Sequence, residues 1–328
     1  MPFRAIRDGQ AVPADFGPCA LTIGNFDGVH AGHRELMRRV AAAAGPHKLR
    51  PTVLTFDPHP AKIVAPARSP RLITTIEERL SLIQAEHMEQ ALVLPFTLDI
   101  ARLRPEEFVR QLLVDTLQAR YVVVGDNFRF GMDQAGDAAM LAKLGEQYGF
   151  RVEAVPAVKL GGVVVSSSEI RKRIGSGVDI GVANEMLERP YALAGRVVSG
   201  HGIGAKQTVP TLNLETAAEV LPGIGVYVTR TSDLDDRRRV WESVTNVGRR
   251  PTFHADGSDG LTIETFLLSE FDGVNPLRIR VEFLKWVREE RKFPSPEALK
   301  QQIFRDVNEA KSFFTAAILE GNPLTGEL

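Results

Sequence analysis

The chain has 328 residues, of which 44% are hydrophobic and 25% are charged, and its formal net charge is −1. This composition is typical of a globular protein, and the length favours two domains, because single hydrophobic cores usually stop growing at about 250–300 residues. The balanced charge argues against a broad nucleic-acid-binding or anionic-membrane surface, and no apolar run approaches the roughly 18 residues of a membrane span.

The single cysteine, Cys19, has no partner for an internal disulfide, which fits a reducing compartment. The first ten residues lack the apolar stretch of a signal peptide. We therefore expect a cytoplasmic protein, with Cys19 as a buried core thiol beside the first predicted strand. The expected partners are small molecules rather than nucleic acid or membrane, and a homo-oligomer is left open.

In the first half of the chain, short runs rich in Val, Ile and Leu alternate with amphipathic segments. The helical spacing of Met37, Val40 and Ala44 predicts the first helix, which we expect to end at Gly45–Pro46. This alternation predicts βαβ units and a parallel sheet that binds ligands at the carboxyl ends of its strands. The predicted strands are Ala20–Ile23, Thr52–Phe56, Ala91–Leu94, Tyr121–Val124 and Val152–Val155.

The pattern changes near residue 185 to short strands separated by turns rich in Gly, Asp, Asn and Pro. It predicts a small antiparallel barrel or sandwich, with one domain at residues 1–186 and another at 187–328. The predicted strands are Gly195–Ser199, Gly225–Arg230, Val240–Thr245, Leu261–Leu268 and Arg278–Trp286.

A terminal helix is predicted after the last strand. Ser295 has the character of an N-cap and Pro296 that of a first helical residue. The apolar face expected for this helix consists of Leu299, Ile303, Val307 and Ala310.

The loop at residues 24–33 joins the first predicted strand to the first predicted helix. Gly24 and Gly28 permit tight turns, and His30 and His33 share a face if both lie on the first helical turn. Free N–H groups at that helix end attract phosphate, and imidazoles there stabilise a leaving pyrophosphate. Two surface histidines or a metal site are the alternatives, but the order of strand, glycine loop and helix favours phosphate.

The same loop resembles the Gly-x-Phe-Asp-Gly-x-His-x-Gly-His signature of the nucleotidylyltransferase superfamily, in the version carried by prokaryotic FAD synthetases. Thr55–Pro60 and Gly125–Gly131 resemble the second and third motifs of that family. Ser166–Arg171 resembles its Ser-Ser-Thr-x-Ile-Arg segment, with Ser168 in place of the usual threonine. The spacing of Ser166 and Glu169 is that of a capping box, so this segment is expected to start a helix.

The resemblance implies a Rossmann-like nucleotidylyltransferase domain that transfers an adenylyl group from ATP to FMN, giving FAD and pyrophosphate. It implies catalytic roles for His30 and His33. The residues that it implies for nucleotide and flavin binding are Gly24, Phe26, Asp27, Gly28, Asp57, His59, Asn127, Ser166, Ser168 and Arg171.

A second glycine-rich segment, residues 200–213, lacks the Gly-Lys-Ser/Thr of a P-loop and on pattern alone is a loop that enters a strand. Thr211 and Asn213 would share a strand face, and their oxygens suit Mg²⁺ bound to nucleotide phosphates. The segment resembles the Pro-Thr-Ala-Asn motif of riboflavin kinases, with Thr208–Val209 where Gly-Phe is common. That resemblance implies that Thr211 and Asn213 bind Mg²⁺–ATP.

Later segments, Gly225–Tyr227, Thr245–Phe253 and Ile263–Leu268, carry the same resemblance. Glu264 shares a strand face with Phe266, and a carboxylate on an apolar face is unusual because burying an unpaired charge is costly. A solvated glutamate on an edge strand is the alternative. The resemblance implies that Glu264 is the catalytic base that accepts the proton of the riboflavin 5′-hydroxyl.

The segment from Arg288 to Phe293 resembles the loop beside the flavin in riboflavin kinases. Phe293 or Trp286 would then pack against the isoalloxazine ring, with a core position as the alternative for either, and we expect the core for Trp286. The residues that the kinase resemblance implies for substrate binding are Gly202, Gly204, Asn246 and Arg291.

The whole sequence therefore predicts a bifunctional enzyme that needs Mg²⁺, converts riboflavin to FMN and then FMN to FAD, and uses ATP for both steps. One alternative is a nucleotidylyltransferase for another phosphorylated metabolite, with the β block as a substrate-holding module. Another is a flavin or nucleotide sensor without catalysis.

Overall fold

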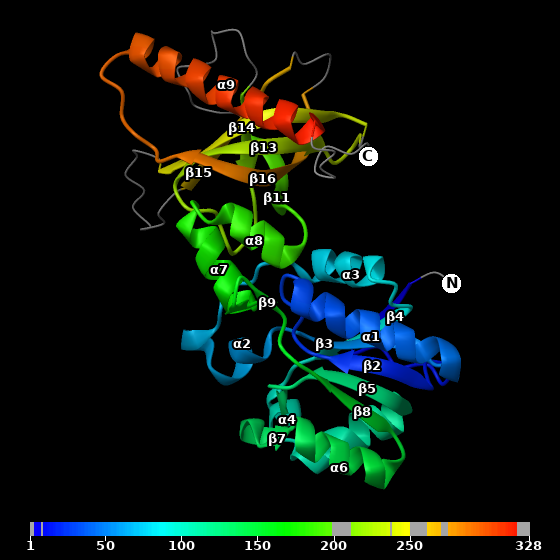
Figure 1. The fold of residues 1–328 in the computed structure, drawn as a ribbon. Coiled ribbons are helices and arrows are strands. Elements are labelled where there is room, and N and C mark those ends of the chain that lie inside the picture. Colours follow the sequence, from blue (N-terminus) through cyan, green and yellow to red (C-terminus); the bar gives the residue numbers. More distant parts are fainter. Residues whose placement is uncertain are drawn as a thin grey trace. The chain divides into compact units, whose positions relative to one another are not determined.

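The computed structural model describes residues 3–7, 9–198, 211–236, 238–249, 261–269 and 275–319 (Figure 1). Contacts within the chain divide it into two compact units, residues 1–167 and 168–328. The boundary predicted between residues 186 and 187 differs from this division of contacts, and it stays a prediction.

A parallel sheet forms the centre of the first unit. Within the described residues its six strands follow the order β1-β4-β3-β2-β5-β8, and all neighbours are parallel. This confirms the predicted α/β fold class and all five predicted strands, whereas β1 is too short to show a pattern in the sequence. The strands are β1 (Arg4–Ile6), β2 (Cys19–Ile23), β3 (Arg50–Asp57), β4 (Gln90–Pro95), β5 (Ala119–Gly125) and β8 (Arg151–Val155).

Helices cover both faces of this sheet (Figure 1). One apolar cluster joins the sheet to α1 (Ala31–His47) and α3 (Ile76–Ala85), and another joins it to η2 (Val109–Thr116) and α6 (Ala138–Tyr148). The shorter elements are α2 (Pro60–Val64), η1 (Pro66–Arg68), α4 (Leu98–Ala101), α5 (Pro105–Phe108), η3 (Met132–Gln134), and two hairpins, β6 (Arg129–Phe130) with β7 (Gly136–Asp137) and β9 (Lys159–Leu160) with β10 (Val163–Val164).

The predicted end of α1 is wrong by two residues. The helix continues through Pro46 to His47, and it stops at Lys48, whose backbone is left-handed (φ 52°) and whose N–H reaches the carbonyls of Ala44 and Gly45. A proline in the last turn removes one helical hydrogen bond, and that loss does not outweigh the burial of Met37 and Ala44 on the sheet.

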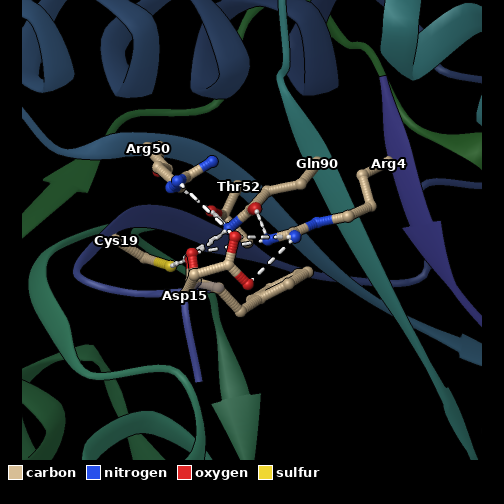
Figure 2. A network of polar contacts seen from close by, with 7 residues as sticks. Arg4, Asp15, Cys19, Arg50, Thr52 and Gln90 are labelled. Carbon is tan, nitrogen blue, oxygen red and sulfur yellow. Dashed lines mark hydrogen bonds and ion pairs between the residues drawn. The ribbon is translucent and has the colours of Figure 1, made fainter. Parts of the chain in front are cut away.

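A polar network ties the amino-terminal ends of four strands, β1 to β4, together at the edge opposite the loop at residues 24–33 (Figure 2). The buried Gln90 donates from Nε2 to the Phe16 carbonyl (2.6 Å) and to Thr52 Oγ1 (3.0 Å), and its Oε1 accepts from Arg4 Nη2 (3.2 Å). Cys19 lies beside this amide and is fully buried, so burial raises the pKa of its thiol. The predicted core thiol is confirmed.

An antiparallel barrel forms the centre of the second unit. Among the residues that the structure describes, six strands close in the order β11-β12-β15-β14-β13-β16. The predicted small antiparallel barrel is confirmed. The strands are β11 (Tyr191–Val198), β12 (Thr211–Glu215), β13 (Gly225–Asp233), β14 (Val240–Arg249), β15 (Leu261–Leu267) and β16 (Arg278–Arg288).

The interior of the barrel contains a chain of buried hydroxyls. Thr229 Oγ1 lies 2.8 Å from Ser243 Oγ and 2.7 Å from Thr245 Oγ1, and Thr245 Oγ1 lies 2.9 Å from Thr265 Oγ1. Each hydroxyl satisfies another, which offsets the cost of burying them. These side chains point inward, so residues at alternate positions, Glu264 among them, point outward.

Three helices belong to the second unit. α7 (Ser167–Ser176) and α8 (Ile180–Leu187) precede the barrel, and Asn184 of α8 donates to the Phe283 carbonyl of β16 (2.8 Å). α9 (Pro296–Leu319) packs against the outer face of the barrel through Ala310 and Phe314. Ser295 caps α9 as predicted, since its Oγ accepts from the N–H of Ala298 (3.2 Å).

The predicted apolar face of α9 is largely wrong. Of its four residues only Ala310 is buried, and Leu299 and Ile303 are exposed. The buried face advances mostly in steps of four residues along the helix. The buried residues are Gln302, Asp306, Ala310, Phe314 and Ala317.

Among the residues that the structure describes, no helix is both long enough and apolar enough to cross a membrane.

The Gln90 network is predicted to stabilise the first unit. Gln90→Met keeps the side-chain volume but leaves the Thr52 hydroxyl without its amide donor and the Phe16 carbonyl with only the Cys19 thiol, so it should lower the free energy of unfolding by about 1–3 kcal/mol. Urea denaturation followed by circular dichroism measures this change. Gln84→Met, at an exposed glutamine of α3, is the matched control, and an equal loss in both variants would contradict the prediction.

Candidate active sites

The loop at residues 24–30 leaves the carboxyl end of β2 and enters α1 through a strained path. Phe26, Gly28 and Val29 all have positive φ, at 49°, 83° and 39°. A Cβ on Gly28 would lie 3.1 Å from Ile73, so both conformation and space favour glycine there. Phe26 and Val29 are buried, and their packing against the sheet holds the turn in place.

Asp27 clamps this loop to the segment that precedes α3. Its buried Oδ1 accepts from the N–H groups of Ile73 (2.9 Å) and Thr74 (3.2 Å), while Thr74 Oγ1 accepts from the N–H of Gly28 (3.1 Å). A carboxylate can be buried here because backbone donors surround it. The structure thus places Asp27 under the loop as a support, so its predicted contact with nucleotide stays a prediction.

His30 and His33 lie together at the start of α1, as the spacing predicted. Their rings are stacked with centroids 3.6 Å apart, and Phe26 packs edge-on against His33 at 5.1 Å. His30 is the N-cap, and its Nδ1 accepts from the N–H of His33 (3.4 Å). In the neutral ring the proton therefore sits on Nε2, so His30 can donate a hydrogen bond from that atom.

The second motif ends β3, next to β2 in the sheet. Asp57 is its last residue, and His59 caps α2 with Nδ1 accepting from the N–H of Ala61 (3.1 Å). Thr55 Oγ1 donates to the carbonyl of Asn25 (3.2 Å), which joins this motif to the first loop. Two of the predicted site histidines, His30 and His59, are thus helix caps.

The third motif follows β5, the strand on the other side of β2. Asn127 is exposed, and its Oδ1 lies 3.1 Å from the position that a Cβ on Gly125 would occupy. Because β2, β3 and β5 are parallel neighbours, their carboxyl ends meet at one edge of the sheet. That edge is the topological switch point where sheets of this kind bind ligands.

The fourth motif begins α7, as predicted from its capping spacing. Ser167, which the sequence did not single out, donates from Oγ to the carbonyl of Asp27 (2.8 Å). Ser166 precedes the helix and is half-buried. Arg171 and Ser168 lie within α7 in the second unit, where Arg171 Nη2 donates to Ser168 Oγ (3.3 Å). Their predicted contact with ATP stays a prediction.

Arg79 was missed in the sequence. It is 1% exposed, its Nη1 donates to the carbonyl of Phe56 (3.3 Å), and its Nε has no hydrogen-bond partner among the described residues. Burial lowers the pKa of Arg79, and the carboxylates of Asp27 and Asp57 oppose this shift. A signal existed, because Arg79 lies on the helix face that Leu80 also uses for the core.

In the barrel, strand register brings three predicted residues into one row. Glu264 of β15 pairs with Asn213 of β12 on one side and with Asn246 of β14 on the other. Directly paired residues point to the same face, with Cβ atoms about 5 Å apart. Thr211, two residues from Asn213, lies on that outer face as well. The row offers one carboxylate and two amides to a ligand.

The environment of Glu264 matches neither of the two sequence interpretations, a carboxylate on an apolar face or a solvated glutamate on an edge strand. β15 lies between two strands of the barrel, so it is no edge strand, yet the Glu264 side chain is exposed. Its direct neighbours across the strands are amides rather than apolar groups. Because Glu264 is exposed, its carboxylate is accessible to a ligand.

The segment after β16 lies close to this row. A Cβ on Gly248 would collide with Glu290 Oε1 and lie 3.0 Å from Asn246 Nδ2, so the Glu290 carboxylate lies beside Asn246. Arg291, the next residue after Glu290, is exposed, and its guanidinium lies 5.0 Å from the centre of the Phe293 ring. Trp286 is only half-buried, so the core position expected for it is met in part.

Gly202 and Gly204 fall outside the described residues, as do residues 250–253 of the kinase motif. In the described ranges no cluster of three or more His, Cys, Asp or Glu side chains could hold a metal ion.

The clamp at Asp27 generates a prediction about stability. Asp27→Ala leaves the buried N–H groups of Ile73 and Thr74 without an acceptor and should lower the free energy of unfolding by about 2–4 kcal/mol. Asp27→Asn keeps an acceptor oxygen and should cost less. Urea denaturation of the two variants measures the difference. Equal costs would show that the charge, rather than the two hydrogen bonds, is what the fold needs.

Comparison with known proteins covers both units. Residues 12–169 match the FAD synthetase family, and residues 187–314 match the riboflavin kinase family. A solved structure described as a macrolide-efflux protein from Streptococcus pneumoniae is 25% identical, covers 95% of this chain and 99% of its own, and superimposes with a TM-score of 0.80.

Two curated relatives carry the description bifunctional riboflavin kinase/FMN adenylyltransferase. The protein of Pseudomonas fluorescens is 35% identical over 294 residues, which cover 90% of this chain and 92% of the relative. The protein of Escherichia coli K12 is 33% identical over 296 residues, which cover 90% and 93%. The chain therefore belongs to the bifunctional riboflavin kinase/FMN adenylyltransferase family.

Proposed function

We propose that this chain phosphorylates riboflavin to FMN in its barrel unit and adenylylates FMN to FAD in its parallel-sheet unit. The observation that carries the proposal is the row Asn213–Glu264–Asn246, where three residues from separate strands meet on one face of the barrel. Family membership and the loop of stacked histidines at the start of α1 support the second activity.

In the kinase reaction, Glu264 takes the proton of the riboflavin 5′-hydroxyl as that oxygen attacks the γ-phosphorus of ATP. The bond between that phosphorus and the β,γ-bridging oxygen breaks, and ADP leaves. An exposed carboxylate that a substrate can reach is suited to accept this proton. Asn213 and Asn246 flank the carboxylate and can orient the substrates by hydrogen bonding.

The side-chain oxygens on the outer face of β12 fit Mg²⁺. Thr211 and Asn213 offer a hydroxyl and an amide oxygen from one strand face, and Mg²⁺ commonly uses few protein ligands because nucleotide phosphates and water supply the rest. We therefore assign the ion to these two residues. When bound, it neutralises the charge of the phosphates.

In the adenylyl transfer, a phosphate oxygen of FMN attacks the α-phosphorus of ATP, and pyrophosphate leaves. The leaving group gains negative charge, which suits the N-terminus of α1, where backbone N–H groups and the Nε2–H of His30 can donate to it. His33, stacked on His30, gives the second imidazole. Asn127 and His59, which follow the two strands that flank β2, complete the proposed pocket.

The two sites can be separated by mutation. Glu264→Gln should lower FMN formation about 10²–10⁴-fold, the range for loss of a general base, and leave FMN-to-FAD conversion intact. His30→Ala should have the reverse effect. Chromatography of flavins after incubation with riboflavin or FMN, ATP and Mg²⁺ measures both steps.

Matched controls are Glu215→Gln, at an exposed glutamate on β12, and His47→Ala, at the other end of α1. Both should retain the two activities. If either active-site variant lost both activities while folded, the two-site assignment would be wrong. If the wild type formed neither FMN nor FAD, the nucleotidylyltransferase for another metabolite or the sensor would be favoured instead.

Chelation tests the role of the ion. EDTA in excess should abolish both activities, and added Mg²⁺ should restore them, because phosphate charge must be neutralised in both transfers. Thr211→Val should raise the Mg²⁺ concentration needed for FMN formation and leave that for FAD formation unchanged. A normal rate of FMN formation in EDTA would contradict the assignment.

A further inference from the structure

The first half of α9 buries polar side chains where apolar ones were available. Gln302 is 8% exposed and Asp306 is 4% exposed, whereas Leu299 is 43% exposed on the same helix. Amphipathic helices normally turn their apolar residues toward the core. The orientation of α9 at this end is therefore set by the partners of Gln302 and Asp306.

Those partners belong to the segment at residues 288–293. Asp306 holds the guanidinium of Arg288 through Nε (3.0 and 3.1 Å) and Nη2 (2.7 Å). Gln302 donates from Nε2 to Asp306 Oδ1 (2.8 Å), and its Oε1 accepts from Nη2 of Arg291. Gln302 and Asp306 thus bind both arginines of the segment. The centre of the Phe293 ring lies 5.7 Å from the guanidinium of Arg288 and 5.0 Å from that of Arg291.

Residues 288–293 lie next to the proposed kinase site. Val226 pairs with Asn246 on one side and with Arg288 on the other, so the row that holds Glu264 continues across the barrel to Arg288. The Glu290 carboxylate lies beside Asn246. The network on α9 therefore fixes side chains that flank the catalytic row.

The charges of residues 288–293 and their partners suit riboflavin better than ATP. Asp306 neutralises Arg288, and the two glutamates and two basic residues at positions 289–292 balance each other, so no net positive charge is left for a triphosphate. An uncharged ring system needs no such charge, and Phe293 offers it an aromatic neighbour. The segment is thus suited to riboflavin rather than to ATP.

We propose that Asp306 and Gln302 are positioning residues that hold residues 288–293 at the riboflavin side of the kinase site. The proposal rests on the proposed kinase function. A buried ion pair is a weak source of stability, since apolar residues of similar volume often serve as well. What it supplies here is a fixed location for Glu290, Arg291 and Phe293.

Asp306→Asn removes the charge that holds Arg288 and keeps the shape of the side chain. The KM for riboflavin should rise about tenfold or more, the scale of one charge-assisted hydrogen bond, while kcat and the KM for ATP stay within about threefold. FMN adenylylation, measured in the same protein, should not change. Asp306→Glu should restore part of the affinity for riboflavin.

A second variant separates positioning from stability. Arg288→Met with Asp306→Leu replaces the ion pair by an apolar pair, so the melting temperature should match or exceed that of Asp306→Asn while the KM for riboflavin stays high. Glu309→Gln is the matched control, because Glu309 forms an exposed ion pair with Lys285 on the same helix and strand (3.2 Å).

Different outcomes would contradict the positioning role, the assignment to the riboflavin side and the kinase function itself. A riboflavin KM in Asp306→Asn equal to that of Glu309→Gln would overturn the positioning role, and so would a normal KM in the double variant. An equal rise in the KM for ATP would overturn the assignment to the riboflavin side. If the wild type made no FMN at all, the proposed kinase function itself would fail.

Discussion

Hydrogen bonding between strands is the constraint on which both proposed sites depend. In the first unit, parallel pairing of β2 with β3 and β5 brings three strand ends to one edge, where Asp57 ends β3 and the loops that lead to His30 and Asn127 begin. In the second unit, antiparallel register sets Glu264 between Asn213 and Asn246. A slip of one residue in the pairing of β15 would turn Glu264 to the face opposite that of Asn213 and Asn246.

Buried polar groups then fix what the strands bring together. Asp27 clamps the first loop through backbone donors, Arg79 holds the end of β3, and Asp306 grips the segment after β16. Each burial would be costly in isolation and becomes tolerable through partners on other elements. Such groups give a loop one location, which apolar packing alone does less well.

Much of the fold was legible in the sequence. Strands of Val, Ile and Leu alternating with helical spacing predicted the parallel sheet, and short strands separated by turns rich in Gly, Asp, Asn and Pro predicted the barrel. The errors have physical causes. Pro46 lies in the last turn of α1 and is tolerated there, and the face of α9 was misassigned because Asp306 and Arg288, 18 residues apart, pair in the fold.

The sequence by itself determined the chemistry on offer: a glycine loop with two histidines before a helix, hydroxyl and amide oxygens at Thr211 and Asn213, and a carboxylate at Glu264. These follow from residue type and short spacing, which a single segment carries. Only the tertiary structure decided that Glu264 lies in a row with two asparagines, and that Arg79 and Asp306 are buried supports. Such facts depend on contacts between distant segments, which local patterns do not encode.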